Sequence, residues 1–130
     1  MQVWIVGILI LYFVQVVIAP TLRYTAGGRK TIWIAMGNRD NPPEMSPLAA
    51  RFDRACVNLQ EALFLFLPLA LLAEMQGASA LAIQGAMVFV IARVIYVPAY
   101  IAGIPGLRST VWAVGHAGII MIGVAILRGG

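Results

Sequence analysis

Four polar side chains stand at the threshold of a strongly apolar stretch. The segment RACVNLQE, residues 54–61, runs directly into ALFLFLPLALLA, residues 62–73. Together with Arg51, the side chains of Arg54, Asn58 and Glu61 follow an i, i+3, i+7, i+10 spacing and project from one face of a helix. The apolar run alone makes about 18 Å of helix, whereas a bilayer core is roughly 30 Å thick, so this polar face must enter the membrane. Such groups are costly at that depth unless they face the bundle or water.

A second polar face occurs on a later apolar segment. Arg93, Tyr96 and Tyr100 share one helical face at the far end of the run 78–92, which by itself makes only about 22 Å of helix. The chain enters the membrane at the start of the segment 47–73 and returns to the same side at the end of the segment 78–101. The two polar faces are therefore predicted to lie at the same depth.

Arg23 and Arg108 stand at the ends of the two remaining apolar segments and are predicted to join this level. Any single arginine could instead snorkel to lipid headgroups or pair with Asp53 or Glu61. Together the arginines outnumber the acidic groups at this depth. The pattern predicts a positively charged pocket that binds an anion.

The amino-acid composition indicates the class of protein to which these polar residues belong. The chain has 130 residues, of which 62% are hydrophobic and 11% charged, and its mean hydropathy is +0.92. These values are typical of an integral membrane protein and leave no room for a separate soluble domain. The single cysteine, Cys56, excludes an internal disulfide and is interpreted as a small buried residue.

The hydropathy pattern predicts an all-α, single membrane domain in the form of a four-helix bundle. Eight of the nine basic residues associate with the first and third connections, so the positive-inside rule places these connections in the cytoplasm and both termini outside. Trp4 and Trp33 are expected to anchor opposite interfaces.

His116 has no second histidine or carboxylate at a spacing that would bind a metal, which favours core packing or an interhelical hydrogen bond. The predicted spans are about 3–22, 47–73, 78–101 and 109–127, with a turn-rich basic cytoplasmic loop over 23–46.

Two motifs resemble those of the MAPEG superfamily, the membrane-associated proteins in eicosanoid and glutathione metabolism. RFDRACVNLQE, residues 51–61, resembles the family's second-helix motif, and RVIYVPAYIAGIPGLRS, residues 93–109, resembles its third-helix arginine and tyrosines. GNRD, residues 37–40, is similar to the loop of bacterial members. The resemblance implies a homotrimer of four-helix subunits that binds glutathione between neighbours near the cytoplasmic surface.

The resemblance also implies roles for individual residues. Arg108 matches the arginine thought to stabilise the glutathione thiolate, since a nearby guanidinium lowers a thiol pKa. Trp112 stands where some family enzymes have a tyrosine, although Ser109 keeps a hydroxyl close by, so Arg108 and Ser109 are the candidate catalytic residues. The implied glutathione ligands are Arg23, Arg51, Arg54, Asn58, Glu61, Arg93, Tyr96 and Tyr100.

The expected function is a glutathione-dependent transferase or peroxidase of a bacterial inner membrane, with glutathione as co-substrate. Its second substrate would be a hydrophobic electrophile or a lipid hydroperoxide from the bilayer; no metal and no nucleic acid is expected. An alternative is a non-enzymatic trimer that binds lipid or serves as an accessory subunit of a larger membrane complex. A proton-coupled exporter would need an acidic residue deep in the first span, and residues 3–22 have none.

Overall fold

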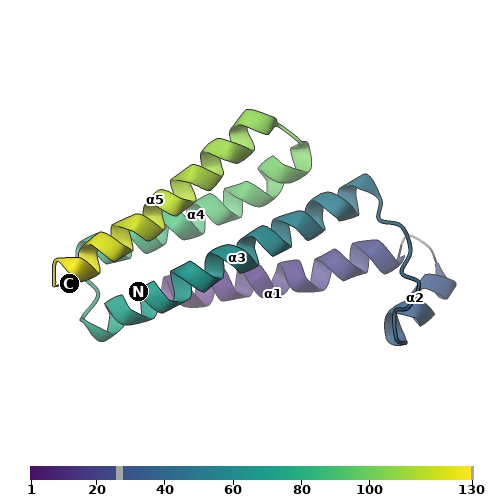
Figure 1. The fold of residues 1–130 in the computed structure, drawn as a ribbon, viewed down its shortest axis with the longest axis horizontal. Helices are drawn as coiled ribbons and strands as arrows, with labels where there is room; N and C mark the ends of the chain where they lie inside the picture. The colour runs from purple at the N-terminus through teal and green to yellow at the C-terminus, as the bar shows by residue number, and fades with distance from the viewer. Residues whose placement is uncertain (26–27, 130) are drawn as a thin grey trace.

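The computed structural model describes residues 1–25 and 28–129, and every regular element in them is a helix. Four long helices form a bundle, and a short fifth helix packs at one end of it (Figure 1). The prediction of an all-α four-helix bundle is confirmed. The helices are α1 (Gln2–Thr25), α2 (Arg29–Met36), α3 (Pro47–Met75), α4 (Ala80–Ala102) and α5 (Pro105–Leu127).

Four helical segments, 2–25, 47–75, 80–102 and 106–127, are long and apolar enough to cross a membrane. Both termini and the α3–α4 connection lie at one end of the bundle, and the α1–α3 segment and the α4–α5 connection lie at the other (Figure 1). This up-and-down arrangement brings the start of α3, the end of α4 and the start of α5 together. It is the end where the sequence concentrates its polar groups.

Local sequence signals set the helix ends. Ser46 and Ser79 cap α3 and α4, where their hydroxyl oxygens accept hydrogen bonds from the backbone N–H groups of Ala49 and Ala82. Pro47 and Pro105 open α3 and α5 at a position where no backbone donor is needed. The last helix therefore starts four residues before the predicted span.

The segment 23–46 contains a helix where only turns were expected. Gly28 and Gly37 flank α2, and Gly28 has a φ of 73°, a backbone conformation that side chains disfavour. The turn residues therefore delimit an eight-residue helix instead of excluding one. Residues 26 and 27 of this segment lie outside the described residues.

Helices α4 and α5 form the closest pair in the bundle. Gly85 and Gly118 face each other, and a Cβ atom added to Gly118 would lie 2.5 Å from the carbonyl oxygen of Gly85. Phe66 of α3 stacks on Phe89 of α4 with ring centroids 4.3 Å apart, and Ile8 and Ile122 are fully buried in the same core. Backbone approach at the glycines thus brings α5 close enough to share a core with α1, α3 and α4.

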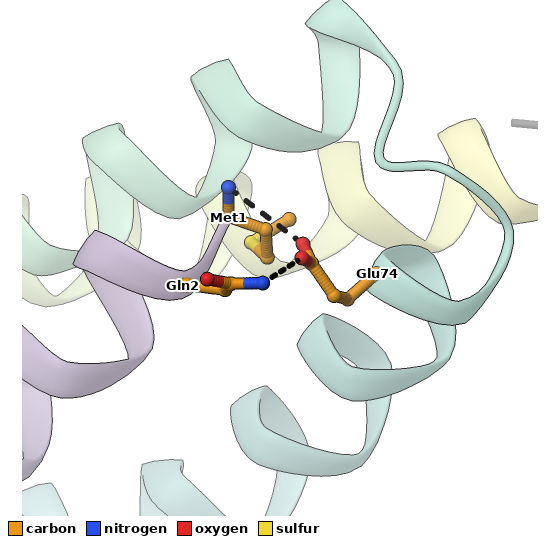
Figure 2. Close-up of polar contacts among 3 residues, drawn as sticks. All are labelled: Met1, Gln2 and Glu74. Atoms are coloured by element: carbon orange, nitrogen blue, oxygen red, sulfur yellow. Dashed lines mark hydrogen bonds and ion pairs between the residues drawn. The ribbon is translucent and has the colours of Figure 1, made fainter.

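A polar contact joins α1 to α3 at the end that holds the termini. Gln2 Nε2 donates to Glu74 Oε1 at 2.8 Å, and the Met1 ammonium lies 3.8 Å from Glu74 Oε2 (Figure 2). Glu74 is therefore at the opposite end of α3 from Arg51. It takes no part in the polar level described below.

Candidate functional site

A cationic cavity of about 210 Å³ lies between the start of α3, the end of α4 and the start of α5. We call it the outer cavity. Arg51 and Arg54 line it from α3, Tyr100 from α4 and Arg108 from α5, and Gly103 and Ile104 complete its wall. Each of the three helices contributes a residue that the sequence had placed at this depth.

Arg51 is held across the C-terminal end of α4. Its Nη1 donates to the carbonyl oxygen of Ile101 at 2.7 Å, where the helix leaves carbonyl groups without intrahelical partners. Gly103 ends the helix in the left-handed conformation, and a Cβ atom there would lie 3.1 Å from the same Nη1. The glycine thus provides both the helix end and the space that the guanidinium occupies.

Tyr100 organises the other two guanidinium groups. Arg54 Nε donates to the Tyr100 hydroxyl oxygen at 3.1 Å. The Arg108 guanidinium carbon lies 5.0 Å from the centre of the Tyr100 ring, which is within the range of a cation–π contact. One tyrosine from α4 therefore positions an arginine from α3 and an arginine from α5.

A second cavity, of about 150 Å³, lies deeper between α3 and α5. We call it the inner cavity. Asn58 and Glu61 line it from α3, and Trp112 and His116 line it from α5, with Ala62 and Leu65 as apolar wall. The Trp112 and His116 rings are 3.9 Å apart, and His116 Nδ1 lies 2.9 Å from the Trp112 carbonyl oxygen. Because a carbonyl only accepts, this nitrogen carries the proton and Nε2 of a neutral ring is an acceptor.

Arg93 and Tyr96 lie behind the cavities and do not line them. Arg93 is 2% exposed, and its Nη1 donates to Asn58 Oδ1 at 2.7 Å. Its guanidinium carbon lies 5.3 Å and 5.5 Å from the ring centres of Phe89 and Tyr96. Its Nε and Nη2 atoms have no hydrogen-bond partner among the described residues. Arg93 therefore orients Asn58 and adds positive charge to the wall.

The charges at this end of the bundle do not neutralise one another. Arg51, Arg54 and Arg108 line the outer cavity, and among the side chains that the structure describes, in residues 1–25, 28–29, 31–104 and 106–129, the ion pair at Glu74 is the only one formed. Glu61 is exposed in the neighbouring cavity. Guanidinium groups that have no carboxylate partner, beside a separate carboxylate, suit a ligand that carries both carboxylates and an ammonium.

The structure divides the predicted site residues into separate groups. Arg51, Arg54, Tyr100 and Arg108 meet in the outer cavity, and Asn58 and Glu61 in the inner one. Ser109 is exposed next to Arg108 in the first turns of α5. Arg23 lines neither cavity, because its Nε donates to the carbonyl oxygen of Pro43 at 3.2 Å.

Trp112 and His116 line the inner cavity; the sequence resemblance places Trp112 where some family enzymes have a tyrosine, but it predicts no binding role for either residue. His116 was expected in core packing or an interhelical hydrogen bond, yet it is half-buried and bonds within its own helix. The signal that could have found both is helical phase, since Trp112 and His116 follow Arg108 by four and eight residues and so share its face.

The model of the MAPEG family matches residues 1–128. This family is generally associated with membranes and with glutathione-related transferase, peroxidase or related functions. Neither the curated proteins nor the solved structures include a significant match to the chain. Because the family match covers nearly the whole sequence and four helices are able to span a bilayer, this chain is an integral membrane protein that belongs to the MAPEG family.

Proposed function

We propose that the protein is a membrane-bound transferase or peroxidase that uses glutathione as co-substrate. The observation that carries the proposal is the arrangement of charge along α3, with the arginines of the outer cavity at one level and Glu61 of the inner cavity at a deeper one. Glutathione carries two carboxylates and one ammonium. The arginine forks suit the glycine carboxylate, and Glu61 suits the ammonium, which shares its carbon with the second carboxylate.

The spacing of the two levels matches the length of the ligand. Seven residues separate Arg54 from Glu61, which corresponds to a rise of about 10 Å along a helix. Three extended residues also span about 10 Å. Glutathione would therefore place its glycine carboxylate at Arg51 and Arg54 and its ammonium at Glu61, with the thiol between them.

Arg108 is the residue proposed to act on the thiol. A guanidinium beside sulfur favours the thiolate, which is the nucleophilic form. In a transferase the thiolate sulfur bonds to an electrophilic carbon while the leaving group departs with its electron pair. In a peroxidase the thiolate sulfur takes the terminal oxygen of a hydroperoxide, the O–O bond breaks, and the alkoxide leaves as an alcohol after it takes a proton. A second glutathione thiol then attacks the sulfenic sulfur, which forms glutathione disulfide and releases water. Ser109, the next residue, is exposed and carries a hydroxyl, which makes it the second candidate catalytic residue.

The proposed active form is a homotrimer. Arg54, Glu61, Arg108 and Trp112 are exposed in the single chain, so the site is open to the outside of the subunit. A neighbouring subunit would close it, exclude water and contribute its own Arg23, which lies apart from both cavities within its own chain. Mass measurement of the protein in nanodiscs tests this stoichiometry.

Conjugation by purified protein tests the enzymatic function. Trimer in nanodiscs should join glutathione to chlorodinitrobenzene or reduce cumene hydroperoxide, and Glu61→Gln should abolish most of that activity at limiting glutathione. Glu74→Gln is the matched control, because Glu74 lies at the opposite end of α3. Absence of glutathione binding by the intact trimer would overturn the proposal.

One observation favours the non-enzymatic alternative, a trimer that binds lipid or serves a larger membrane complex. Arg51 and Arg54 already have partners within the chain, the Ile101 carbonyl and the Tyr100 hydroxyl. These two arginines could therefore stabilise the packing of α3 against α4 without binding a ligand. Undiminished function of an Arg54→Leu, Glu61→Gln double variant in the host, together with no thiol conjugation in vitro, would support this alternative.

The orientation that we propose places both termini in the periplasm of a bacterial inner membrane, because the basic residues cluster at the other end. Single cysteines at Gln2 and at Asn38, both exposed positions, should react oppositely with a membrane-impermeant thiol reagent in intact cells. The native Cys56 is buried and is replaced by alanine for this assay. Labelling at Asn38 from outside would invert the topology.

A further inference from the structure

Helix α2 is attached directly to the end of α1. The Thr31 hydroxyl donates to the carbonyl oxygen of Tyr24, and the Gly28 N–H donates to that of Thr25 at 3.2 Å. Helix α1 has 24 residues and is therefore about 36 Å long, slightly more than the roughly 30 Å of a bilayer core. When a helix of this length crosses the bilayer, its last turn reaches the headgroup level, and α2, which is bonded to that turn, is brought to the same level.

One side of α2 is apolar and uncovered. Trp33 and Met36 are 71% and 73% exposed, and Ile32 beside them is 43% exposed. Large apolar side chains at such exposure call for a cover, and tryptophan is enriched at the level of lipid headgroups. These side chains lie at the end of a membrane-spanning helix, where the bilayer surface adjoins the lipid around α1. The bilayer surface is therefore the environment that can bury them.

Basic residues flank this apolar side. Arg29 begins α2 and is exposed. Arg39 follows α2 and is oriented by two contacts, because its Nε donates to the Ala35 carbonyl oxygen at 3.2 Å and its guanidinium carbon lies 5.9 Å from the Tyr24 ring centre. Within residues 1–25 and 28–129, no carboxylate pairs with either arginine. Both remain available to an external anion.

A cavity of about 310 Å³ lies between α1 and α2 beside Arg39. Pro20 and Tyr24 line it from α1, and Ile32, Ala35 and Met36 line it from α2. Its walls are thus largely apolar, with one guanidinium as the cationic group. A molecule that fits must combine an apolar body with an anionic group.

We propose that α2 is an interfacial helix and that this cavity binds an anionic phospholipid. The Arg39 fork receives the phosphate, Arg29 adds positive charge, and an acyl chain lies against α1 in the cavity. Trp33 and Met36 enter the same leaflet. A short helix with apolar residues on one side and basic residues beside them is the arrangement that binds anionic membrane surfaces. The site is separate from the outer and inner cavities, so it does not depend on glutathione binding.

Fluorescence quenching tests the depth of α2. The full-length protein is placed in nanodiscs of phosphatidylcholine and phosphatidylglycerol that carry bromine either near the ester end or near the chain end. The difference between wild type and Trp33→Phe isolates the Trp33 signal from the other two tryptophans. We expect Trp33 to be quenched more strongly by the shallow bromine. Equal weak quenching by both lipids, with strong quenching by aqueous iodide, would overturn the interfacial position.

Lipid retention tests the site. Phosphatidylglycerol retained by the purified trimer is compared with phosphatidylcholine by native mass spectrometry in wild type, Arg39→Gln and Arg128→Gln. We expect Arg39→Gln to lower the preference for the anionic lipid about fivefold, which corresponds to about 1 kcal/mol for one basic residue at an anionic surface. Arg128→Gln removes an exposed arginine at the other end and should change the preference less than twofold. Equal effects of the two variants, or full displacement of the lipid by glycerol phosphate, would overturn a phospholipid site.

Discussion

Replacing Arg108 with leucine should raise the pKa of the glutathione thiol in the bound state. Arg108 lines the outer cavity, and its guanidinium carbon lies 5.0 Å from the centre of the Tyr100 ring; in the proposed binding mode the sulfur lies next to this cavity. A cation beside the sulfur lowers the free energy of the thiolate and leaves that of the neutral thiol nearly unchanged. Removing the cation therefore shifts the equilibrium toward the thiol.

The size of the shift follows from distance and exposure. A unit charge about 5 Å from the thiolate contributes about 3 kcal/mol at an effective dielectric constant of about 20, or about two pKa units. Arg108 is exposed, so solvent screening reduces this to about one unit. If the bound thiol moves from a pKa of about 7.5 to its ordinary value of about 8.5, the thiolate fraction at neutral pH falls about eightfold.

The assay is the ultraviolet absorbance of the bound thiolate as a function of pH, together with kcat over the same range. Wild type and Arg108→Leu should differ about eightfold at neutral pH and converge well above the ordinary thiol pKa of about 8.5. Arg54→Leu is the matched control from the same cavity and should raise the KM for glutathione with little change in the thiol midpoint. An unchanged midpoint in Arg108→Leu, with full activity, would remove Arg108 from the mechanism.

Three further variants test other parts of the structure. Glu61→Gln should weaken glutathione binding about tenfold to a hundredfold by calorimetry, since a charge-assisted contact is worth about 1.5 to 3 kcal/mol, whereas Glu74→Gln should leave it unchanged; equal effects would contradict an ammonium site at Glu61. Gly118→Ala should lower the melting temperature by separating α4 from α5, at about 1 to 3 kcal/mol, whereas Gly123→Ala has nothing within 4 Å of the added Cβ and should be neutral. Arg93→Leu should destabilise the protein by about 1 to 3 kcal/mol because it removes the hydrogen bond to the half-buried Asn58 oxygen, and an unaltered melting curve would contradict that pairing.

Much of the fold could be predicted because the bilayer limits the choices. Apolar stretches of sufficient length must become helices, since a backbone in hydrocarbon has to satisfy its own hydrogen bonds. The prediction of four such helices is confirmed. Helix α2 escaped prediction because it lies outside this constraint, where Gly28 and the contact of Thr31 with Tyr24 decide whether a short segment closes into a helix.

Parts of the candidate site could also be predicted from spacing. Helical phase placed Arg51, Arg54, Asn58 and Glu61 on one face, and all four line cavities. Helical periodicity could not predict which of these residues line the outer cavity and which line the inner cavity. That division depends on which residue of another helix stands opposite each position, and on the path of that helix.

The sequence by itself determined the membrane class, the number of long helices and the residue types at the polar level, because these follow from hydropathy and from periodicity along single helices. Only the tertiary structure decided that Arg93 faces the protein interior at 2% exposure and pairs with Asn58, while Arg108 meets Tyr100 at the cavity. The two arginines look alike in sequence, since each stands beside an apolar run at the same predicted membrane level, Arg93 after residues 78–92 and Arg108 before residues 109–127. Their environments differ because the approach of α4 to α5 at Gly85 and Gly118 sets how each helix is rotated and which of its residues is enclosed.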